Sequence, residues 1–169
     1  MTGIDPDGER IFGLVPPEVA LELTGLEFLS RIVDGTFPSP PFAQTANMAL
    51  TDVSAGRAVF EAHPDEKFFN PLGTIHGGWI STVLDSALGC AVHTTLDAGL
   101  LYTTVELSVR MVRKVMPASG PMLCEGNVVH RGRRIITAEA RLIDAHGKLA
   151  AHGSVTCLVL ETSGAQPDG

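Results

Sequence analysis

Long apolar runs are missing from this sequence of 169 residues, although 44% of its residues are hydrophobic. No run approaches the roughly 18 residues that a membrane-spanning helix requires, so we expect no membrane insertion. The segment 1–10 also lacks the basic and apolar regions of a secretory signal peptide, and we therefore expect a cytoplasmic protein. At this length a single globular domain with a substantial core is the default expectation.

Basic residues are few, because 12 Lys and Arg stand against 19 Asp and Glu and give a net charge of −7. This balance argues against a nucleic-acid partner, which would need a basic surface. One local cluster of basic residues, Arg131-Gly132-Arg133-Arg134, offers a place for a phosphorylated ligand. The alternative is that the cluster is the solvated turn of an ordinary hairpin.

Cysteine is also scarce, and Cys90, Cys124 and Cys157 are more than thirty residues apart. Neither a zinc spacing nor a redox spacing occurs, and an odd number of cysteines does not suit a disulfide framework. We expect reduced thiols in the core or an interface, although Cys90 is a candidate nucleophile on a predicted helix. The histidines other than His76 show no metal-binding spacing, so the sequence predicts no metal site.

The first part of the chain carries a helical pattern that begins at Pro16-Pro17 and extends to about Val33. Prolines suit the first turn of a helix, and apolar residues recur at helical spacing until Asp34-Gly35. The proline-rich segment 37–42 is typical of an extended connector. Residues 1–43 are too few to form their own core, so we interpret them as an extension of a domain that spans 44–162. We expect a disordered tail at 163–169.

A long apolar helix is predicted from Gly77 to about Leu96. Its apolar residues recur at helical spacing and predict one continuous buried stripe, which consists of Ile80, Leu84, Ala87, Leu88, Ala91, Val92 and Thr95. The opposite face carries mostly small residues, namely Thr82, Ser86, Gly89, Cys90 and His93. This second face either allows another subunit to approach closely or lies in solvent.

Alternating apolar and polar residues predict strands on both sides of this helix. Segments 48–54 and 57–63 are expected to form a hairpin, and four further strands are expected within 102–115, 121–130, 133–144 and 148–160. Two strands, one long helix and four strands predict an α+β domain. In such a domain the apolar face of an antiparallel sheet packs around the helix.

The segment Asn70-Pro71-Leu72-Gly73-Thr74-Ile75-His76-Gly77-Gly78 is a glycine-rich turn that opens the long helix. The first N–H groups of a helix have no partner within it, and the helix dipole adds partial positive charge there. Such an end can hold an anion or stabilise an oxyanion. Asp85 follows nine residues after His76, about two and a half turns along the helix. An oxyanion donor combined with a carboxylate suggests hydrolysis of an activated acyl group.

This segment, Asp85 and the later Thr104-Val105-Glu106 resemble the signature of phenylacetate-pathway-type (PaaI-like) acyl-CoA thioesterases, and the order of elements resembles the hotdog fold. The resemblance covers about residues 44–160. It implies a hotdog domain, in which an antiparallel sheet is wrapped around one long central helix, here with an extra N-terminal helix. It also implies an acyl-CoA substrate, no metal, and no cofactor other than the coenzyme A of the substrate. The family forms a homodimer or a dimer of dimers (a homotetramer), with active sites between subunits.

The resemblance also implies roles for individual residues. It assigns the oxyanion-binding N–H to Gly77 and the catalytic carboxylate to Asp85 of the opposing subunit. Asn70 and His76 would orient the thioester or water, and Thr104 would position water. In the family, the loop equivalent to the cluster Arg131-Gly132-Arg133-Arg134 often contacts coenzyme A phosphate.

Further substrate contacts are expected near the start of the helix. Gly78 adjoins the proposed oxyanion donor, and Trp79 is expected to shape the acyl pocket. Phe68 and Phe69 either line this pocket or close the bottom of the core.

Two threonines compete for one position in the strand after the helix. The alternation of polar and apolar residues places Thr103 on the face toward the helix and Thr104 on the polar face. A bulge or the end of the strand is therefore needed if Thr104 is to reach Asp85.

We expect an acyl-CoA thioesterase that hydrolyses a small or medium, aromatic or aliphatic acyl-CoA, with Asp85 as base or nucleophile. Two alternatives stay open. A hotdog dehydratase of 3-hydroxyacyl thioesters would pair His76 with Asp85. A non-catalytic regulatory module would bind acyl-CoA without turnover.

Overall fold

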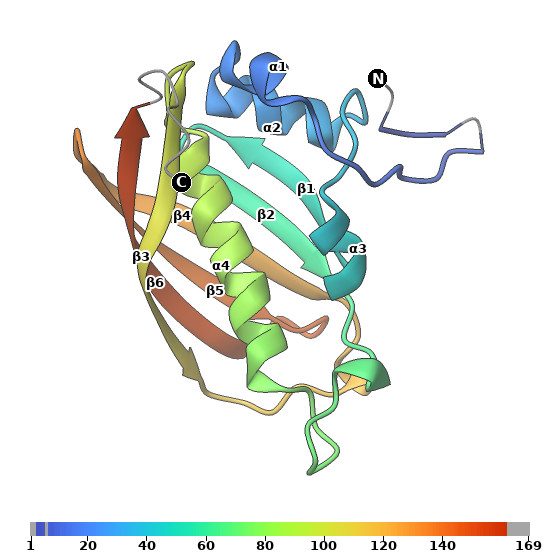
Figure 1. Cartoon of the computed structure of the whole chain (residues 1–169). Helices are drawn as coiled ribbons and strands as arrows, with labels where there is room; N and C mark the ends of the chain where they lie inside the picture. The colour runs from blue at the N-terminus through green and yellow to red at the C-terminus, as the bar shows by residue number, and fades with distance from the viewer. Residues whose placement is uncertain (1–2, 6, 162–169) are drawn as a thin grey trace, which may run out of the picture.

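One antiparallel sheet runs through the computed structural model, which describes residues 3–5 and 7–161 (Figure 1). Its six strands lie in the order β1-β2-β4-β5-β6-β3. Their bounds are Met48–Ser54 for β1, Arg57–Ala62 for β2, Leu100–Met111 for β3, Met122–Arg131 for β4, Ile135–Ile143 for β5 and Leu149–Glu161 for β6. Each predicted strand is confirmed to within a few residues. The tail expected at 163–169 lies outside the described residues.

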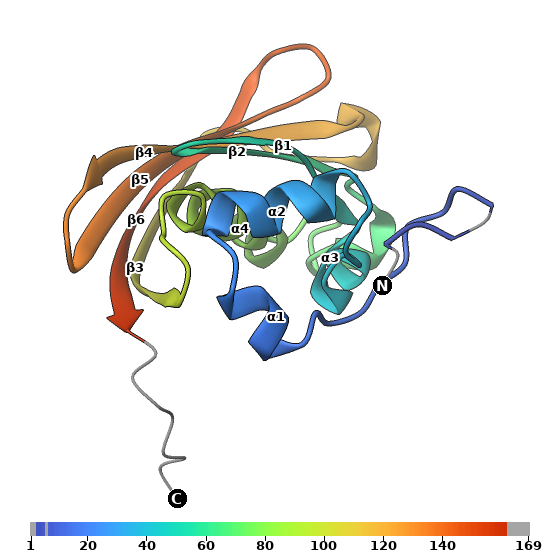
Figure 2. The same cartoon turned by 90° about the horizontal axis from the view of Figure 1, so that it is seen from above.

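The predicted long helix is α4, which spans Gly77–His93 and ends three residues earlier than expected. The stripe from Ile80 to Val92 is buried, and most of these side chains have no exposed surface. The alternating apolar residues of β5, Ile136, Ala138, Ala140 and Leu142, are buried against it. Figure 2 shows the sheet as one layer curved over α4, with all the α-helices on the same side. This is the hotdog arrangement that the resemblance implied.

The N-terminal part of the chain forms three short helices rather than one. Helix α1 covers Pro17–Leu21 and α2 covers Gly25–Val33, so the continuous helix predicted from Pro16 to Val33 is wrong. The reason is a capping box, in which Thr24 accepts a hydrogen bond from the Glu27 N–H and the Glu27 carboxylate accepts one from the Thr24 N–H. Such a cap begins a new helix even though the apolar spacing continues across it.

The segment predicted as an extended connector ends in a helix. Helix α3 covers Pro41–Ala46, begins after Pro40 and stops at Asn47, whose φ of 54° is left-handed. Proline is compatible with the first turn of a helix and also with an extended segment, so the proline-rich sequence did not distinguish the two. The predicted boundary between residues 43 and 44 falls inside α3 and stays a prediction.

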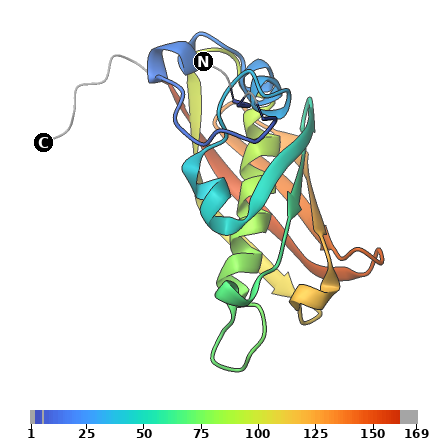
Figure 3. The same cartoon turned by 90° about the vertical axis from the view of Figure 1, so that its right-hand side faces the viewer.

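The N-terminal segment packs directly on α4, as Figures 1 and 3 show from two sides. The Gly25 N–H donates to the Leu96 carbonyl, and the Phe28 ring lies 5.6 Å from the His93 ring. On the same face of α4, a methyl group on Gly89 would lie 2.5 Å from the Tyr102 hydroxyl oxygen. At this end the chain itself packs on the small-residue face of α4, whereas Thr82 and Ser86 stay partly exposed, and the approach of another subunit stays a prediction.

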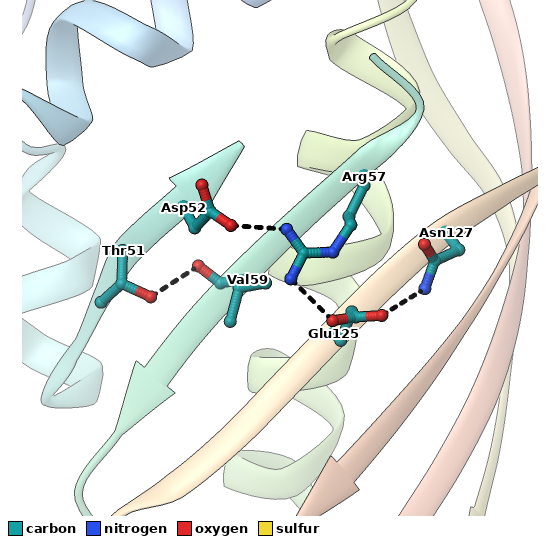
Figure 4. A network of polar contacts seen from close by, with 6 residues as sticks. All are labelled: Thr51, Asp52, Arg57, Val59, Glu125 and Asn127. Carbon is teal, nitrogen blue, oxygen red and sulfur yellow. Dashed lines mark hydrogen bonds and ion pairs between the residues drawn. The ribbon is translucent and has the colours of Figure 1, made fainter. Parts of the chain in front are cut away.

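The outer face of the sheet, away from the helices, carries a polar network (Figure 4). The Arg57 guanidinium bridges Asp52 of β1 and Glu125 of β4, and Asn127 donates to the other oxygen of Glu125. The contacts tie three strands together without touching the core. Two short 3₁₀ helices, Glu66–Phe68 and Pro117–Ser119, complete the described elements. No helix among the described residues is both long and apolar enough to cross a membrane.

Candidate active site

The start of α4 leaves one backbone donor available. His76 is the N-cap, and its Nδ1 atom accepts a 2.8 Å hydrogen bond from the Gly78 N–H. The N–H groups of Trp79 and Ile80 donate to the His76 carbonyl. Within the described part of the chain, the Gly77 N–H makes no hydrogen bond. Gly77 rather than Gly78 therefore offers the free donor at the positive end of the helix dipole.

Asn70 closes the loop that leads into α4. Its Oδ1 accepts from the N–H groups of Leu72 and Thr74, and its Nδ2 donates to the Thr74 hydroxyl at 2.8 Å. Gly73 has a φ of 72°, which this tight loop requires and a side chain would resist. The amide nitrogen of Asn70 carries a second hydrogen, so the side chain can hold the loop and still donate to a ligand.

A cavity of about 340 Å³ lies beside this end of α4 and is lined by Asn70, Gly77 and Met111, among others. Arg113 and Lys114 also line it, and the sequence reasoning missed both. The available signal was the pair of adjacent cations near the end of the strand expected within 102–115, and the observed strand β3 ends before them at Met111. They add positive charge close to the free N–H of Gly77.

Asp85 lies two turns further along α4 and is half-buried. Its Oδ1 accepts a hydrogen bond of 3.4 Å from the Thr104 hydroxyl. Loss of hydration raises the pKa of the Asp85 carboxyl above its ordinary value, and the hydrogen bond from Thr104 partly opposes this rise. A carboxylate with a raised pKa is a stronger base than an ordinary aspartate.

Thr104 reaches Asp85 because β3 contains a bulge. Thr104 pairs with Cys157 and Glu106 pairs with the next residue, Thr156, so Val105 has no partner in β6. The extra residue reverses the alternation, and Thr103 and Val105 both point away from α4 as exposed residues. Thr104 is the threonine that faces the helix, and the placement of Thr103 on the apolar face is wrong.

A second cavity, of about 290 Å³, lies next to Asp85 and Thr104. Most of its wall is apolar and comes from the N-terminal helices, β1, β2 and β3 as well as α4, including Leu29, Phe42, Met48, Phe60 and Tyr102. Most of this wall was not predictable from the sequence, because its residues are far from the motif that carries Asp85.

Cys90 also lines this second cavity, but burial raises the pKa of its thiol to about 12, with a contribution from the Asp85 charge. The thiol is therefore neutral near pH 7 and lacks the thiolate form that a nucleophile needs. Cys90 is better explained as part of the cavity wall than as a catalytic group.

The free Gly77 N–H and the Asp85 carboxylate are separated within one chain. Eight residues of α-helix span about 12 Å, and the two groups line different cavities. A single carbonyl group is too small to meet both. The described chain therefore does not bring these two groups together at one point.

The predicted aromatic contacts surround the His76 end of α4. Trp79 is buried and its Nε1 donates to the Ala46 carbonyl at 2.7 Å, while Phe68 stacks on the indole at 5.5 Å. Both line a third cavity of about 240 Å³ together with His76. Phe69 packs partly buried against the core instead.

The basic cluster Arg131-Gly132-Arg133-Arg134 lies at the other end of α4. Arg131 donates to the Thr95 carbonyl and lies 4.0 Å from Asp97, and the three arginines line an open cavity of about 540 Å³. Since the 17 residues of α4 span about 25 Å, this cluster is far from Gly77 of the same chain.

Comparisons with known sequences place the chain among acyl-group hydrolases. The sequence pattern of the Thioesterase superfamily matches residues 72–151, which include Gly77, Asp85 and Thr104. The chain is also similar to a Saccharolobus solfataricus protein named "Putative esterase SSO2140". The two are 32% identical over 116 residues, which cover 69% of this chain and 81% of that protein.

Solved structures give the same result for the fold. A phenylacetic acid degradation-related protein of Ralstonia eutropha JMP134 is 27% identical with a TM-score of 0.70, covering 77% of this chain and 98% of that one. The BH2602 protein of Bacillus halodurans, solved with CoA, is 28% identical with a TM-score of 0.57. That match covers 60% of this chain and 66% of the other.

Proposed function

Since this chain belongs to the thioesterase superfamily of hydrolases, we propose that it hydrolyses a small or medium acyl-CoA, aromatic or aliphatic, to a free acid and coenzyme A. The observation that carries the proposal is the half-buried Asp85 carboxylate, bonded to Thr104 on the wall of a largely apolar cavity. The CoA bound to a structural relative supports coenzyme A as the carrier of the acyl group.

The proposed active site is built from two subunits. Gly77 of one subunit and Asp85 of the other would face the same thioester carbonyl, because the two groups of one chain are about 12 Å apart along α4. Strand β3 supports this assembly, since it is an edge of the sheet and exposes Leu101 and Val105. Pairing of β3 with its copy would join two sheets and bring two α4 helices close together.

In the proposed reaction, the Gly77 N–H binds the carbonyl oxygen while the Asp85 carboxylate accepts a proton from water. The water oxygen bonds to the carbonyl carbon, and the resulting oxyanion stays on the Gly77 donor. The C–S bond then breaks, the thiolate leaves, and the proton held by Asp85 passes to sulfur. One oxyanion donor contributes about 3–4 kcal/mol, and a positioned base accelerates such a step by about 10²–10⁴-fold.

Asp85 has a second route, in which its carboxylate attacks the carbonyl carbon directly and forms a mixed anhydride that water then opens. Thr104 serves either route, because its hydroxyl fixes the orientation of the carboxylate. Hydroxylamine distinguishes them, since it converts an anhydride at Asp85 to a hydroxamate that mass spectrometry of the protein detects. Direct attack by water leaves Asp85 unmodified.

The cations near the two ends of α4 are proposed to bind the phosphates of coenzyme A. Arg113 and Lys114 lie beside Gly77, whereas the Arg131–Arg134 cluster lies at the opposite end. Substituting each group separately by glutamine and measuring KM assigns the role. The group that binds phosphate raises KM for acyl-CoA more than KM for an acyl thioester of pantetheine, which lacks the nucleotide phosphates.

The proposed function is tested by thiol release from a panel of acyl-CoAs, with Asp85→Asn and Asp85→Ala as matched variants. The wild type is expected to release thiol, and both variants should lose about 10²-fold or more in kcat while their melting temperatures stay near or above that of the wild type. Full activity of either variant would refute Asp85 as the catalytic carboxylate.

The same assays separate the alternatives. A 3-hydroxyacyl-CoA that yields an enoyl product without free thiol would indicate a dehydratase. Saturable binding of acyl-CoA by the wild type without any turnover would indicate a regulatory module. In the described structure His76 already accepts the Gly78 N–H through Nδ1, so a dehydratase would depend on its Nε2 atom alone.

A further inference from the structure

The cavity beside Asp85 is closed by residues outside the segment that matches the thioesterase superfamily. Helix α2 contributes Leu29 and Ile32, and the segment around α3 contributes Ser39, Pro40, Phe42 and Ala43. The matched segment covers residues 72–151 only. Part of the wall opposite α4 therefore comes from the N-terminal segment, which precedes the matched residues.

We propose that this cavity is the acyl chamber and that Phe42 is the partition that limits the length of the acyl group it accepts. This inference rests on the proposed function, because it assumes that Asp85 acts on an acyl thioester. It assigns a role in substrate specificity to the N-terminal segment, for which the motif around Asp85 predicts no role.

The contents of the cavity wall fit an acyl group. The two polar groups that face the reaction, the Asp85 carboxylate and the Thr104 hydroxyl, occupy one part of the wall, and most of the remainder is apolar. An apolar cavity of roughly 150 Å³ holds benzene, so about 290 Å³ has room for an aromatic ring with a short linker or for a medium aliphatic chain. A long fatty acyl chain exceeds this volume.

Phe42 lies between the acyl chamber and the third cavity, which is lined by Phe68, His76 and Trp79. Phe42 lines both cavities, whereas each of the neighbouring residues named below lines only one of them. On α4, Ser86 lines the chamber, and Thr82, one turn earlier, lines the third cavity. On α3, Ala43 lines the chamber and Ala46 lines the third cavity. The two cavities thus follow one another along the α3–α4 contact, with Phe42 at their border.

Phe42 can be replaced without removing a core residue, because 56% of its surface is exposed. Alanine at this position would connect the acyl chamber with the third cavity, which has about 240 Å³ of its own. The larger indole of tryptophan would instead reduce the space at the border. The two substitutions therefore change the accepted chain length in opposite directions.

The test uses the full chain and compares the wild type with Phe42→Ala, Phe42→Trp and Leu14→Ala. Leu14 is the matched control, because it lies in the same N-terminal segment, is 78% exposed and lines none of these cavities. The measurement is kcat/KM for butanoyl-, hexanoyl-, octanoyl-, decanoyl-, palmitoyl- and phenylacetyl-CoA by thiol release. Melting temperatures verify that each variant is folded.

Phe42→Ala is expected to raise the ratio of kcat/KM for decanoyl-CoA over hexanoyl-CoA by about tenfold or more, and Phe42→Trp to lower it. Leu14→Ala should leave the ratio unchanged. An unchanged ratio in both Phe42 variants, with an active wild type, would overturn the partition and leave the proposed function intact. Absence of thiol release by the wild type from every member of the panel would overturn the proposed function and the chamber with it.

Discussion

The Asp85 carboxyl group lies where a negative charge is unfavourable, because burial raises its pKa. Within the described residues, only Thr104 donates a hydrogen bond to this carboxylate. The proposed reaction needs the deprotonated form. Activity is therefore expected to fall on acidification at a pH above the ordinary aspartate value of 3.8. Burial therefore moves this limb of the pH profile to higher pH, and the Thr104 hydroxyl partly opposes that shift.

Thr104→Val removes that hydroxyl while keeping the shape of the side chain. Since the hydrogen bond lowers the pKa of Asp85, its loss should move the acidic limb of kcat/KM to higher pH. Thr104→Ser, which keeps a hydroxyl, is the control and should keep the wild-type limb. The measurement is kcat/KM between pH 4 and 8. A limb that does not move in Thr104→Val would show that Asp85 is not the group that titrates.

Gly77 offers a second test at single-atom level, because the proposed donor is its backbone N–H. Gly77→Pro removes this hydrogen at the first position of α4, where proline is well tolerated and His76 already has an extended conformation. We expect kcat to fall by about 10²–10³-fold. Gly77→Ala is the control, since both variants add a Cβ atom toward the flexible end of Met111 but alanine keeps the N–H. Equal losses in both variants would attribute the effect to crowding by Met111.

Much of the arrangement at the candidate site was predictable from the residues alone. The free N–H at the start of the helix and the acid nine residues after His76 are local features of one helix, and the structure has both where the sequence predicts. The resemblance named Thr104, but its orientation toward the helix was not predictable from the alternation of polar and apolar residues, which carries no sign of the unpaired Val105. Arg113 and Lys114 were missed because only the path of the chain after β3 brings them to Gly77.

Among the elements, the sheet is held on its outer face by Arg57, which joins β1, β2 and β4 (Figure 4). Arg57→Gln is expected to lower the free energy of unfolding by about 1 kcal/mol or less, because both carboxylate partners are substantially exposed. The measurement is urea unfolding of the wild type and the variant. Salt at 1 M should reduce the difference, since it screens exposed charges.

The ion pair between Arg57 and Glu125 also predicts that the free energy of unfolding depends on pH. The hydrogen bond from Arg57 holds the pKa of Glu125 below its ordinary value of 4.5. A lowered pKa contributes stability above the unfolded value, and this contribution is lost as the pH falls through the folded value. The difference between wild type and Arg57→Gln should thus be constant near neutral pH and shrink below about pH 4.5. A difference that grows on acidification would contradict the assignment.

Regular elements were predictable where one periodicity runs through them. Helix α4 and the strands have an apolar period that matches their geometry, and their bounds agree to within a few residues. The N-terminal helices were not, because the apolar spacing continues from α1 into α2 and only the Thr24 cap divides them. At α3 the prolines were compatible with both a helix and an extended segment.

For the whole molecule, a site shared between subunits makes a prediction that no single-chain site makes. Co-expression of Asp85→Asn and Gly77→Pro chains, each inactive by itself, should restore about a quarter of wild-type activity, because half of randomly paired dimers are mixed and each mixed dimer has one intact site. The measurement is thiol release by the unseparated mixture, and mixed dimers isolated through one tag on each chain should have about half of the wild-type activity.

The control for this experiment is Asp85→Asn co-expressed with Asp85→Ala, which leaves no intact site in any pairing. Restored activity in that control would point to contamination by wild-type protein. If the mixed Asp85→Asn and Gly77→Pro dimers stay inactive, each site takes both groups from one chain and the proposed assembly is wrong.

The acyl chamber is also a property of the whole molecule, because it is formed by segments far apart in sequence that only the folded chain brings together.

The unpaired Val105 has a consequence for how the two parts of the site depend on one another. Before it, the even-numbered residues Tyr102 and Thr104 point inward, and after it the odd-numbered Leu107 and Val109 do so, followed by Met111 beside Gly77. In an uninterrupted strand Thr104 and Met111 would point to opposite faces. One inserted residue therefore shifts which side chains of β3 point inward, so that a single strand contacts the Asp85 carboxylate through Thr104 and lies beside the proposed oxyanion donor through Met111.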